Sequence, residues 1–352
     1  MDLSTTNLSS ESGKDKDNSS FLTADPKQLK DGFVTKLDGL GLMAASGIDA
    51  VPFIHGQLSN DIEHLGQAQS RLAGYSTPKG RLLATFLIWK TTDRILMQLP
   101  REVLPALQKR LQMYVLRAKV TLADTSDEYV ALGLGGRKAA EALSLLFATL
   151  PSEPYAIVQS ESGTLIRVAD AFGFPRYQLI AKPDDAREAW DNLTSVLQPT
   201  HDGAWRMADI DAGIPQITVT TQDQFVAQMV NLEVVGGVSF KKGCYPGQEI
   251  IARTQYLGKA KRRMLPASID LDADRGEATA GNEVYSEADP GQPCGMIVSA
   301  QRTGSSQVAC LVSVRMDMLE KGTVHLGSAD GPSLQFGDLP YELPDTAPAP
   351  TA

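Results

Sequence analysis

The pattern of apolar residues changes near Pro266, and this change constrains the fold more than any other feature of the sequence. Before it, strand-like runs at residues 82–89 and 94–99 alternate with amphipathic stretches such as residues 184–197. After it, short alternating apolar runs are separated by Gly, Pro, Asp and Ser, with few helical stretches. Interleaved strands and helices predict an α+β fold rather than a bundle or a sandwich. The second part predicts a small all-β domain.

Other elements of the first part follow from apolar periodicity. The runs at 82–89 and 94–99 flank Thr-Thr-Asp and predict a hairpin. Residues 102–113 and 137–150 are expected to be helical, like residues 184–197. Strands are expected at residues 165–168 and 177–181, on either side of a turn-rich segment.

The two ends of the sequence are polar or rich in proline. We therefore expect tails without regular structure at residues 1–25 and 344–352, an α+β region at 26–265 and a β domain at 266–343. The start lacks the apolar core of a secretory signal. Apolar runs stay far below the roughly 20 residues that a bilayer requires. We therefore expect no membrane partner. Three cysteines without a CxxC pair do not form a disulfide framework, which predicts a cytoplasmic protein.

The charge is unevenly distributed. The chain has 33 Lys and Arg against 42 Asp and Glu, a net charge of −9, which argues against binding nucleic acid through bulk charge. Residues 241–263 contain seven cations and only Glu249 as an acid, a net charge of +6. We therefore expect one anionic partner at this segment, either a small anionic ligand, a phosphate backbone or an acidic protein.

Residues 241–249, K-K-G-C-Y-P-G-Q-E, hold the densest chemistry. Pro246 suits the first position of a helix, and Glu249 would favour the positive end of its dipole. Cys244 would precede that helix beside two lysines, and both features stabilise a thiolate. Cys310 alternates with valines and is expected to be structural, whereas the role of Cys294 stays open.

The sequence resembles the YgfZ family, the folate-binding relatives of the glycine-cleavage T-protein that support iron–sulfur proteins and tRNA modification. The strongest match is to the family signature at Lys242, Gly243, Cys244, Tyr245, Gly247, Gln248 and Glu249. Weaker matches occur in the family's order at residues 55–61, 79–81, 115–122, 205–215, 231–240 and 339–341.

The resemblance implies a T-protein-like ring of α+β lobes around a hole that accepts tetrahydrofolate, followed by a small C-terminal β-barrel. Trp205 matches a tryptophan implicated in folate binding, and a second family aromatic falls at Leu40. Asp211 lies where T-proteins carry a glutamate that contacts the pterin. Arg253 of the basic segment becomes a candidate for binding the glutamate tail of folate.

One absence bears on catalysis. The paired aspartates of T-proteins, one of them catalytic, fall on Ala84 and Thr85. Neither side chain can steer a proton or stabilise a developing cation as a carboxylate does. The T-protein aminomethyl transfer is therefore not expected, and whether any reaction is catalysed stays open.

Three functions remain. The first is a folate-dependent factor that assembles or repairs iron–sulfur clusters in enzymes such as tRNA methylthiotransferases, without holding a stable cluster or metal of its own. Cys244 would act as a transient iron ligand or form a mixed disulfide or another adduct. The second is a one-carbon (aminomethyl-type) transferase on an unknown acceptor, with Asp211, Glu249 or Cys244 as base. The third is a protein or RNA interaction module in which Cys244 and Trp205 are structural.

Overall fold

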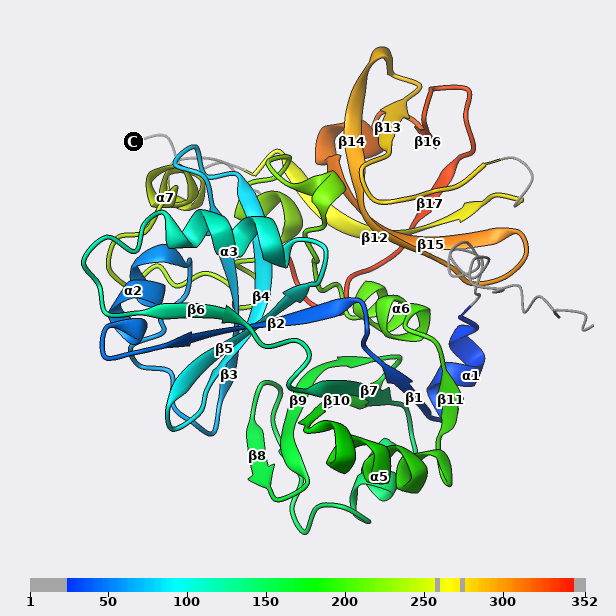
Figure 1. Ribbon diagram of the computed structural model, residues 1–352. Helices are drawn as coiled ribbons and strands as arrows, with labels where there is room; N and C mark the ends of the chain where they lie inside the picture. Colours follow the sequence, from blue (N-terminus) through cyan, green and yellow to red (C-terminus); the bar gives the residue numbers. More distant parts are fainter. Residues whose placement is uncertain (1–23, 257–259, 273–275, 345–352) are drawn as a thin grey trace, which may run out of the picture.

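A computed structural model describes residues 24–256, 260–272 and 276–344 (Figure 1). The expected tails at 1–25 and 344–352 therefore lie outside the described residues except for their inner ends, as does Lys259 of the basic segment. At the inner end of the first tail, Ala24 is buried and Asp25 caps the first helix. Among the described residues, no helix is long and apolar enough to cross a bilayer.

The first lobe is an antiparallel sheet in the order β3-β4-β5-β2-β6. The expected hairpin is confirmed by β4 and β5, and the helix expected at 102–113 by α3, whose apolar face is buried. Only the end of segment 115–122 is in a strand, because residues 113–120 form the loop before β6. The bounds are β2 Leu40–Ser46, α2 Ala50–Gln57, β3 Ser70–Ser76, β4 Leu82–Lys90, β5 Arg94–Pro100, α3 Leu104–Gln112 and β6 Thr121–Asp124.

The second lobe is a mixed sheet in the order β11-β1-β7-β10-β9-β8. The helix expected at 137–150 is shorter than predicted, since α4 ends at Leu143 and turns follow. α5 matches the third expected helix and buries Ala186, Ala189 and Leu193. The bounds are α1 Pro26–Asp31, β1 Phe33–Lys36, β7 Val130–Gly135, α4 Ala139–Leu143, β8 Ile157–Ser160, β9 Gly163–Ala171, β10 Phe174–Ala181, α5 Pro183–Thr194, β11 Gln198–Thr200 and α6 Gly203–Asp211.

The C-terminal sheet confirms the expected all-β part and is nearly closed into a barrel. Its order is β16-β13-β14-β15-β12-β17, and a bridge between His325 and Ser333 joins its two edges. The sheet begins at Arg262, slightly before Pro266. Cys294 and Cys310 are both buried in its core. The bounds are β12 Arg262–Asp270, β13 Glu283–Ser286, β14 Asp289–Arg302, β15 Gln307–Arg315, α8 Met316–Leu319, β16 Val324–Leu326 and β17 Leu334–Phe336.

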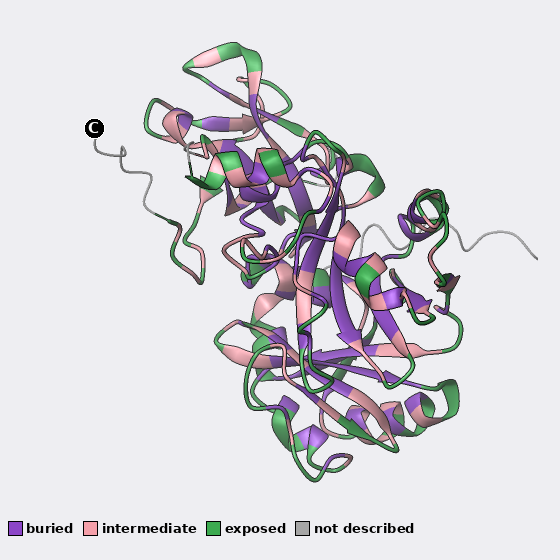
Figure 2. Ribbon diagram, turned by 90° about the vertical axis from the view of Figure 1, so that its left-hand side faces the viewer, coloured by how far each residue is buried: buried purple, intermediate pink, exposed green. Residues whose placement is uncertain are grey.

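A long connection from residue 212 to 256 fills the space between the lobes and the barrel. It contains the short helices η1 Val219–Thr221 and η2 Ala227–Val230 and the helix α7 Gln248–Tyr256. Its apolar side chains share a core with Leu82, Ile210 and Val298, so all three units contribute to that core. Figure 2 shows buried residues continuing along the central strands from lobe to barrel. Residues 339–341 are not in a strand; Tyr341 instead donates a hydrogen bond from Oη to Gly213 O at 2.7 Å.

Candidate functional site

A cavity lies where the two lobes meet. It encloses about 610 Å³ of empty space, part of it open to solvent. Strands β2, β3, β4 and β5 line it from the first lobe, and β9, β10 and α6 from the second. The apolar lining includes Leu40, Leu72, Phe86, Leu87, Leu99, Val168 and Ile214, and the polar or aromatic lining includes Thr85, Gln98, Tyr155, Arg176, Gln178, Trp205 and Asp209.

Arg176 and Asp209 form a partly buried ion pair in this lining. Arg176 is 1% exposed, and its Nη1 lies 2.9 Å from Asp209 Oδ1. Its Nε donates to the carbonyl oxygen of Ala169. Burial raises the pKa of Asp209, and the neighbouring guanidinium opposes that rise. The cavity therefore holds a carboxyl group whose charged form is favoured mainly by Arg176 and to a smaller extent by Arg206.

Trp205 lines the cavity, but its ring is largely covered. The guanidinium carbon of Arg176 lies 4.6 Å from the ring centroid. A Cβ atom at Gly133 would lie 2.5 Å from a ring carbon, so the indole also packs closely against β7. Trp205 is only 5% exposed. The expected tryptophan is at the cavity, yet its face is not an open stacking platform.

Asp209, rather than Asp211, contributes the cavity carboxylate. Asp211 does not line the cavity, and its Oδ2 accepts a hydrogen bond from the backbone of Phe172. Residues two positions apart on a helix point about 200° apart, whereas residues four positions apart share a face. Trp205 and Asp209 are four apart on α6 and therefore point together. This spacing was the sequence signal that could have identified Asp209; no comparable signal indicated Arg176.

Thr85 and Ala84 occupy opposite faces of β4. Thr85 lines the cavity, where its Oγ1 donates to Pro215 O at 3.3 Å and accepts from Ile217 N at 3.1 Å. Ala84 is buried in the core of the first lobe. The hydroxyl at the T-protein aspartate position thus holds the 215–217 segment in place.

Gln178 supplies an unused acceptor in the lining. It is 4% exposed, and its Oε1 has no hydrogen-bond partner among the described residues. A buried acceptor without a partner is costly, and it is satisfied when a ligand presents an N–H group. Together with Asp209, it fits a ligand edge that carries several N–H donors.

A second feature is the loop that carries Cys244, which is exposed and does not line the cavity. Lys242 holds this loop against the C-terminal end of α2, since its Nζ donates to His55 O and to Leu58 O, the latter at 2.7 Å. The same Nζ lies 4.7 Å from the ring centroid of Tyr245. Burial lowers the pKa of Lys242 to about 8.

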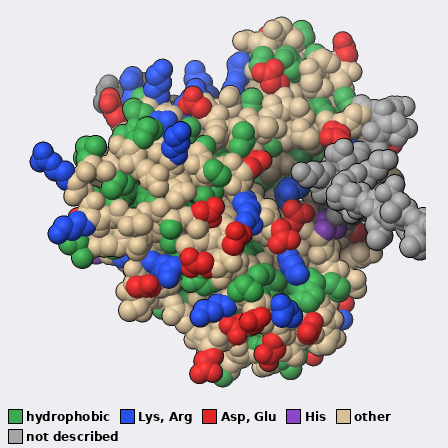
Figure 3. All heavy atoms as spheres, in the orientation of Figure 1, with side chains coloured by type: hydrophobic (Ala, Val, Ile, Leu, Met, Phe, Trp, Pro, Cys, Tyr) green, Lys and Arg blue, Asp and Glu red, His purple; other side chains and the backbone are tan. Residues whose placement is uncertain are grey.

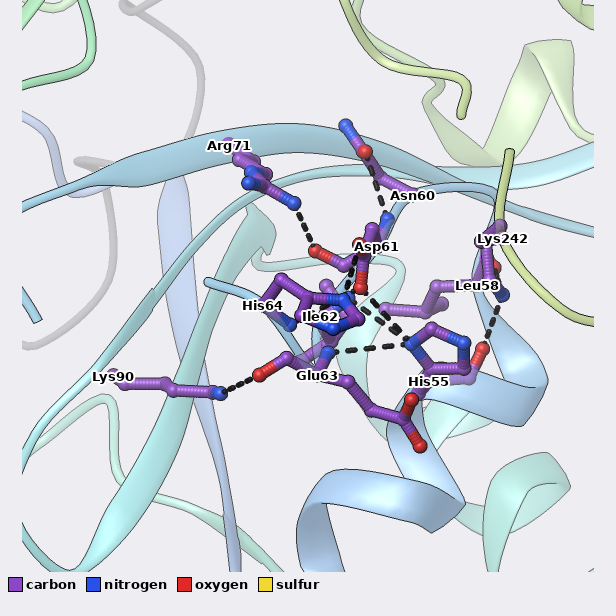
Figure 4. Close-up of polar contacts among 10 residues, drawn as sticks. All are labelled: His55, Leu58, Asn60, Asp61, Ile62, Glu63, His64, Arg71, Lys90 and Lys242. Atoms are coloured by element: carbon purple, nitrogen blue, oxygen red, sulfur yellow. Dashed lines mark hydrogen bonds and ion pairs between the residues drawn. The ribbon is translucent and has the colours of Figure 1, made fainter. Parts of the chain in front are cut away.

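His55 lies beside the same loop (Figure 4). Its Nδ1 accepts from the backbone N–H groups of Ile62 and Glu63 at 3.3 and 3.2 Å. Burial, followed by the charge of Lys242, lowers its pKa below the usual 6.5. A neutral ring that accepts at Nδ1 carries its proton on Nε2. A Cβ atom at Gly243 would lie 3.8 Å from that Nε2, which places a donor next to the cysteine loop.

The helix after Cys244 begins at Gln248, so the expected start at Pro246 is wrong. Gly247 has φ +82°, which a right-handed helix does not allow, and Gln248 N donates to Tyr245 O at 3.2 Å. These contacts form a turn with Pro and Gly at its centre. Gly247 packs against Gly80, so residues 79–81 lie in contact with the family signature at residues 242–249.

The basic segment does not form one surface patch. Arg263 is 5% exposed and pairs with the buried carboxylate of Glu233, while Lys242 is engaged by α2. Lys241, Arg253 and Lys261 are exposed. Figure 3 shows Lys and Arg side chains gathered along the upper left of this face, near α7 and the start of β12. Arg253 is therefore on the surface and outside the cavity lining.

The cavity and the cysteine loop are joined by the segment between residues 232 and 245. Leu232 lines the cavity. A few residues on, Gly236 O and Gly237 O accept hydrogen bonds from Asn60 Nδ2 and Ser59 Oγ at 2.7 and 2.6 Å. In the described ranges, no group of three or more His, Cys, Asp or Glu side chains is arranged to hold a metal ion.

The relatives of the chain identify its family. No family model matches the chain. The tRNA-modifying protein YgfZ of Klebsiella pneumoniae (strain 342) is 30% identical over 311 residues, which cover 88% of this chain and 93% of that protein. The chain belongs to the YgfZ family. The tRNA-modifying protein YgfZ of Shigella sonnei (strain Ss046) is 29% identical over 87% of this chain and 92% of its own length.

The fold is shown by a solved structure. The glycine cleavage system aminomethyltransferase T from Bartonella henselae superposes with a TM-score of 0.70, at 16% identity, over 89% of this chain and 87% of that chain. This YgfZ-family chain therefore has the expected T-protein-like fold.

Proposed function

We propose that this protein supports tRNA modification by helping to assemble or repair iron–sulfur clusters in enzymes such as tRNA methylthiotransferases. Tetrahydrofolate would occupy the cavity, and Cys244 would be the reactive group. The names of the two YgfZ relatives support the link to tRNA modification. The exposed Cys244 on a loop held by Lys242 is the observation that carries the proposal. The work would take place in the cytoplasm.

The cavity residues fit a reduced pterin. Asp209 and Gln178 offer acceptors to the N–H groups of an aminopyrimidinone edge, and Leu40, Leu72 and Phe86 offer apolar walls. Because Arg176 covers Trp205, the planar guanidinium would present the flat surface nearest that side. Tetrahydrofolate, when bound, supplies a carrier for a one-carbon unit.

Lys242 and His55 place two N–H donors on or beside the loop that carries Cys244. Lys242 is positively charged below about pH 8, and His55 keeps an N–H on its Nε2 next to the loop. Both groups are held by backbone hydrogen bonds, so they need little reorganisation when negative charge develops at the thiol. Exposure lets the sulfur reach a group on another macromolecule. Transient iron ligation, a mixed disulfide and another adduct are each compatible with this environment.

A second candidate function is a one-carbon transferase on an unknown acceptor. The observation in its favour is the carboxyl group of Asp209, whose raised pKa suits proton transfer inside a cavity. Thr85 and Ala84 still argue against the T-protein reaction itself.

The deciding experiment is complementation of cells that lack the protein. Methylthiolated tRNA is measured by mass spectrometry after expression of wild type or Cys244→Ala, with protein levels matched by immunoblot. We expect wild type to restore the modification and Cys244→Ala to fail. Full rescue by Cys244→Ala would overturn the role of the thiol. Turnover of methylene-tetrahydrofolate by purified Cys244→Ala would favour the transferase.

A further inference from the structure

Several large apolar side chains on the first lobe are exposed to solvent. Among the described residues, three of the exposed ones fall within residues 113–116, in the loop between α3 and β6 at the left of Figure 1. Leu116 is 86% exposed and Met113 is 63% exposed, with Tyr114 between them. Ile48, at 78%, is the fourth member of this group. Contiguous exposed apolar surface in a soluble protein commonly marks an interaction site.

Ile48 lies on the same surface, because the next residue, Asp49, is hydrogen-bonded to the 113–120 loop. Asp49 Oδ2 accepts from Lys119 N at 2.7 Å, and Asp49 N donates to Lys119 O at 3.3 Å. Beneath this junction, Val51, Val115 and Val120 pack on the core of the first lobe. The exposed side chains are thus presented by a supported backbone. We refer to Ile48, Met113, Tyr114, Leu116 and the exposed cations Lys109, Arg117 and Lys119 as the α3–β6 surface.

This surface is basic in an acidic protein. Residues 103–123 contain those three exposed cations and the partly buried Arg110, with no Asp or Glu, whereas the whole chain carries −9. Within the part of the chain that the structure describes, none of the three exposed cations forms an ion pair with a carboxylate. An apolar centre with charged residues at its rim is the usual anatomy of a protein interface.

We propose that the α3–β6 surface binds an acidic, amphipathic segment of a partner protein. The partner's apolar side chains would cover Ile48, Met113 and Leu116, and its carboxylates would pair with Arg117 and Lys119. This proposal does not rest on the chemistry of folate or of clusters.

Charge and side-chain type favour a short protein segment over other anionic partners. Three of the four exposed apolar residues are aliphatic and offer no ring on which a base could stack. An extended polyanion or an anionic bilayer would also run onto the rest of the surface, which is acidic on balance. A short segment needs only the local cations.

The α3–β6 surface lies on the same lobe as His55 and Leu58, the residues that bind Lys242 of the Cys244 loop. Arg110 interacts electrostatically with the hydroxyl of Tyr75, whose pKa is raised by burial. Tyr75 in β3 bridges to Leu58, and Leu58 O accepts from Lys242. A partner segment bound here would therefore be held on the lobe that positions the thiol.

The test uses a fluorescein-labelled 16-residue peptide with Leu at the i, i+3, i+4 and i+7 positions of a helix and Glu elsewhere, titrated with full-length protein and followed by anisotropy. We expect binding by wild type, and at least about tenfold weaker binding by Leu116→Glu and by the double variant Arg117→Glu/Lys119→Glu. Leu145→Glu, at another exposed apolar residue, is the matched control and should bind like wild type. Leu116→Ser repeats the test without an added charge.

Three results would overturn the proposal. The first is equal binding of the peptide by wild type and the Leu116 variants, each shown to be folded by circular dichroism. The second is no peptide binding by wild type, with binding instead of single-stranded RNA or of anionic phosphatidylserine vesicles that Leu116→Ser abolishes. The third is self-association of wild type in sedimentation analysis that the Leu116 variants lose, which would assign the surface to a second copy of the chain.

Discussion

Arg176 lies over the ring of Trp205, with its guanidinium carbon 4.6 Å from the ring centroid, and at the same time pairs with Asp209. The tryptophan that the family resemblance assigns to folate is therefore covered by a cation. Recognition of a pterin at this cavity would depend more on hydrogen bonding to Asp209 and Gln178 than on stacking against the indole.

Asp209→Asn should weaken tetrahydrofolate binding by about tenfold or more, because a hydrogen bond to a charged group contributes roughly 1.5–3 kcal/mol. Isothermal titration calorimetry measures the affinity. Asp211→Asn is the matched control, since it changes the same residue type on the same helix outside the cavity lining. Equal loss in both variants would contradict the assignment of Asp209.

Lys242→Met should slow the alkylation of Cys244 by iodoacetamide, and the difference from wild type should shrink with rising pH. The pKa of Lys242 is about 8, so its ammonium is present below that pH and is lost above it. Burial of Cys294 and Cys310 leaves Cys244 as the reporter. Lys242→Arg retains the charge and should show no such narrowing. A rate ratio that is constant from pH 6.5 to 9.5 would exclude this role.

Acid should destabilise the protein through His55. Its pKa is below the usual 6.5 in the folded chain, so the unfolded chain takes up the proton first as pH falls. The free energy of unfolding therefore decreases as pH drops below about 6.5. His55→Asn keeps an acceptor near the N–H groups of Ile62 and Glu63 and removes the titration. Urea unfolding at pH 7.5 and 5.5 should show a smaller loss of unfolding free energy in this variant than in wild type. An equal loss in both would show that groups other than His55 cause the acid destabilisation.

Gly247→Ala should cost about 3 kcal/mol or more of folding free energy. The residue has φ +82°, and a Cβ would lie 2.6 Å from Thr77 O and 2.7 Å from Gly80 Cα. Gly236→Ala is the matched control, because Gly236 has φ +80° with nothing within 4 Å of a Cβ. This variant should lose only the roughly 1–2 kcal/mol that an alanine pays in a left-handed backbone conformation. Thermal or urea unfolding compares the two, and equal costs would show that the contact with Gly80 is unimportant.

Elements with a strong local pattern could be predicted from the sequence. The β4–β5 hairpin, α5 and the strand with Cys310 each follow from apolar periodicity, and the change near Pro266 corresponds to the start of the barrel sheet. A local sequence pattern does not show which distant residues a side chain will contact in the folded protein. Arg263 reads as a surface cation, yet it is buried against Glu233, thirty residues earlier.

The candidate site shows the same limit at single residues. Pro246 suits a helix start, but the left-handed conformation of Gly247 delays the helix to Gln248. Asp211 matches by sequence position, while helical phase places Asp209 beside Trp205 in the lining. His55 lies next to Gly243 of the family signature, although the two residues are far apart in the sequence. This contact could not be predicted, because only the tertiary structure brings the two segments together.

The contact of Lys242 with the carbonyl groups of His55 and Leu58 has a consequence for biosynthesis. Lys242 follows His55 by 187 positions and Leu58 by 184 positions in the chain. While the protein is being translated, the first lobe emerges with the end of α2 uncapped, and its capping lysine arrives only two residues before Cys244. Nascent chains that stall before this point carry neither the thiol nor its neighbouring charge. Cys244 and the lysine that anchors its loop are therefore added to the nascent chain almost together.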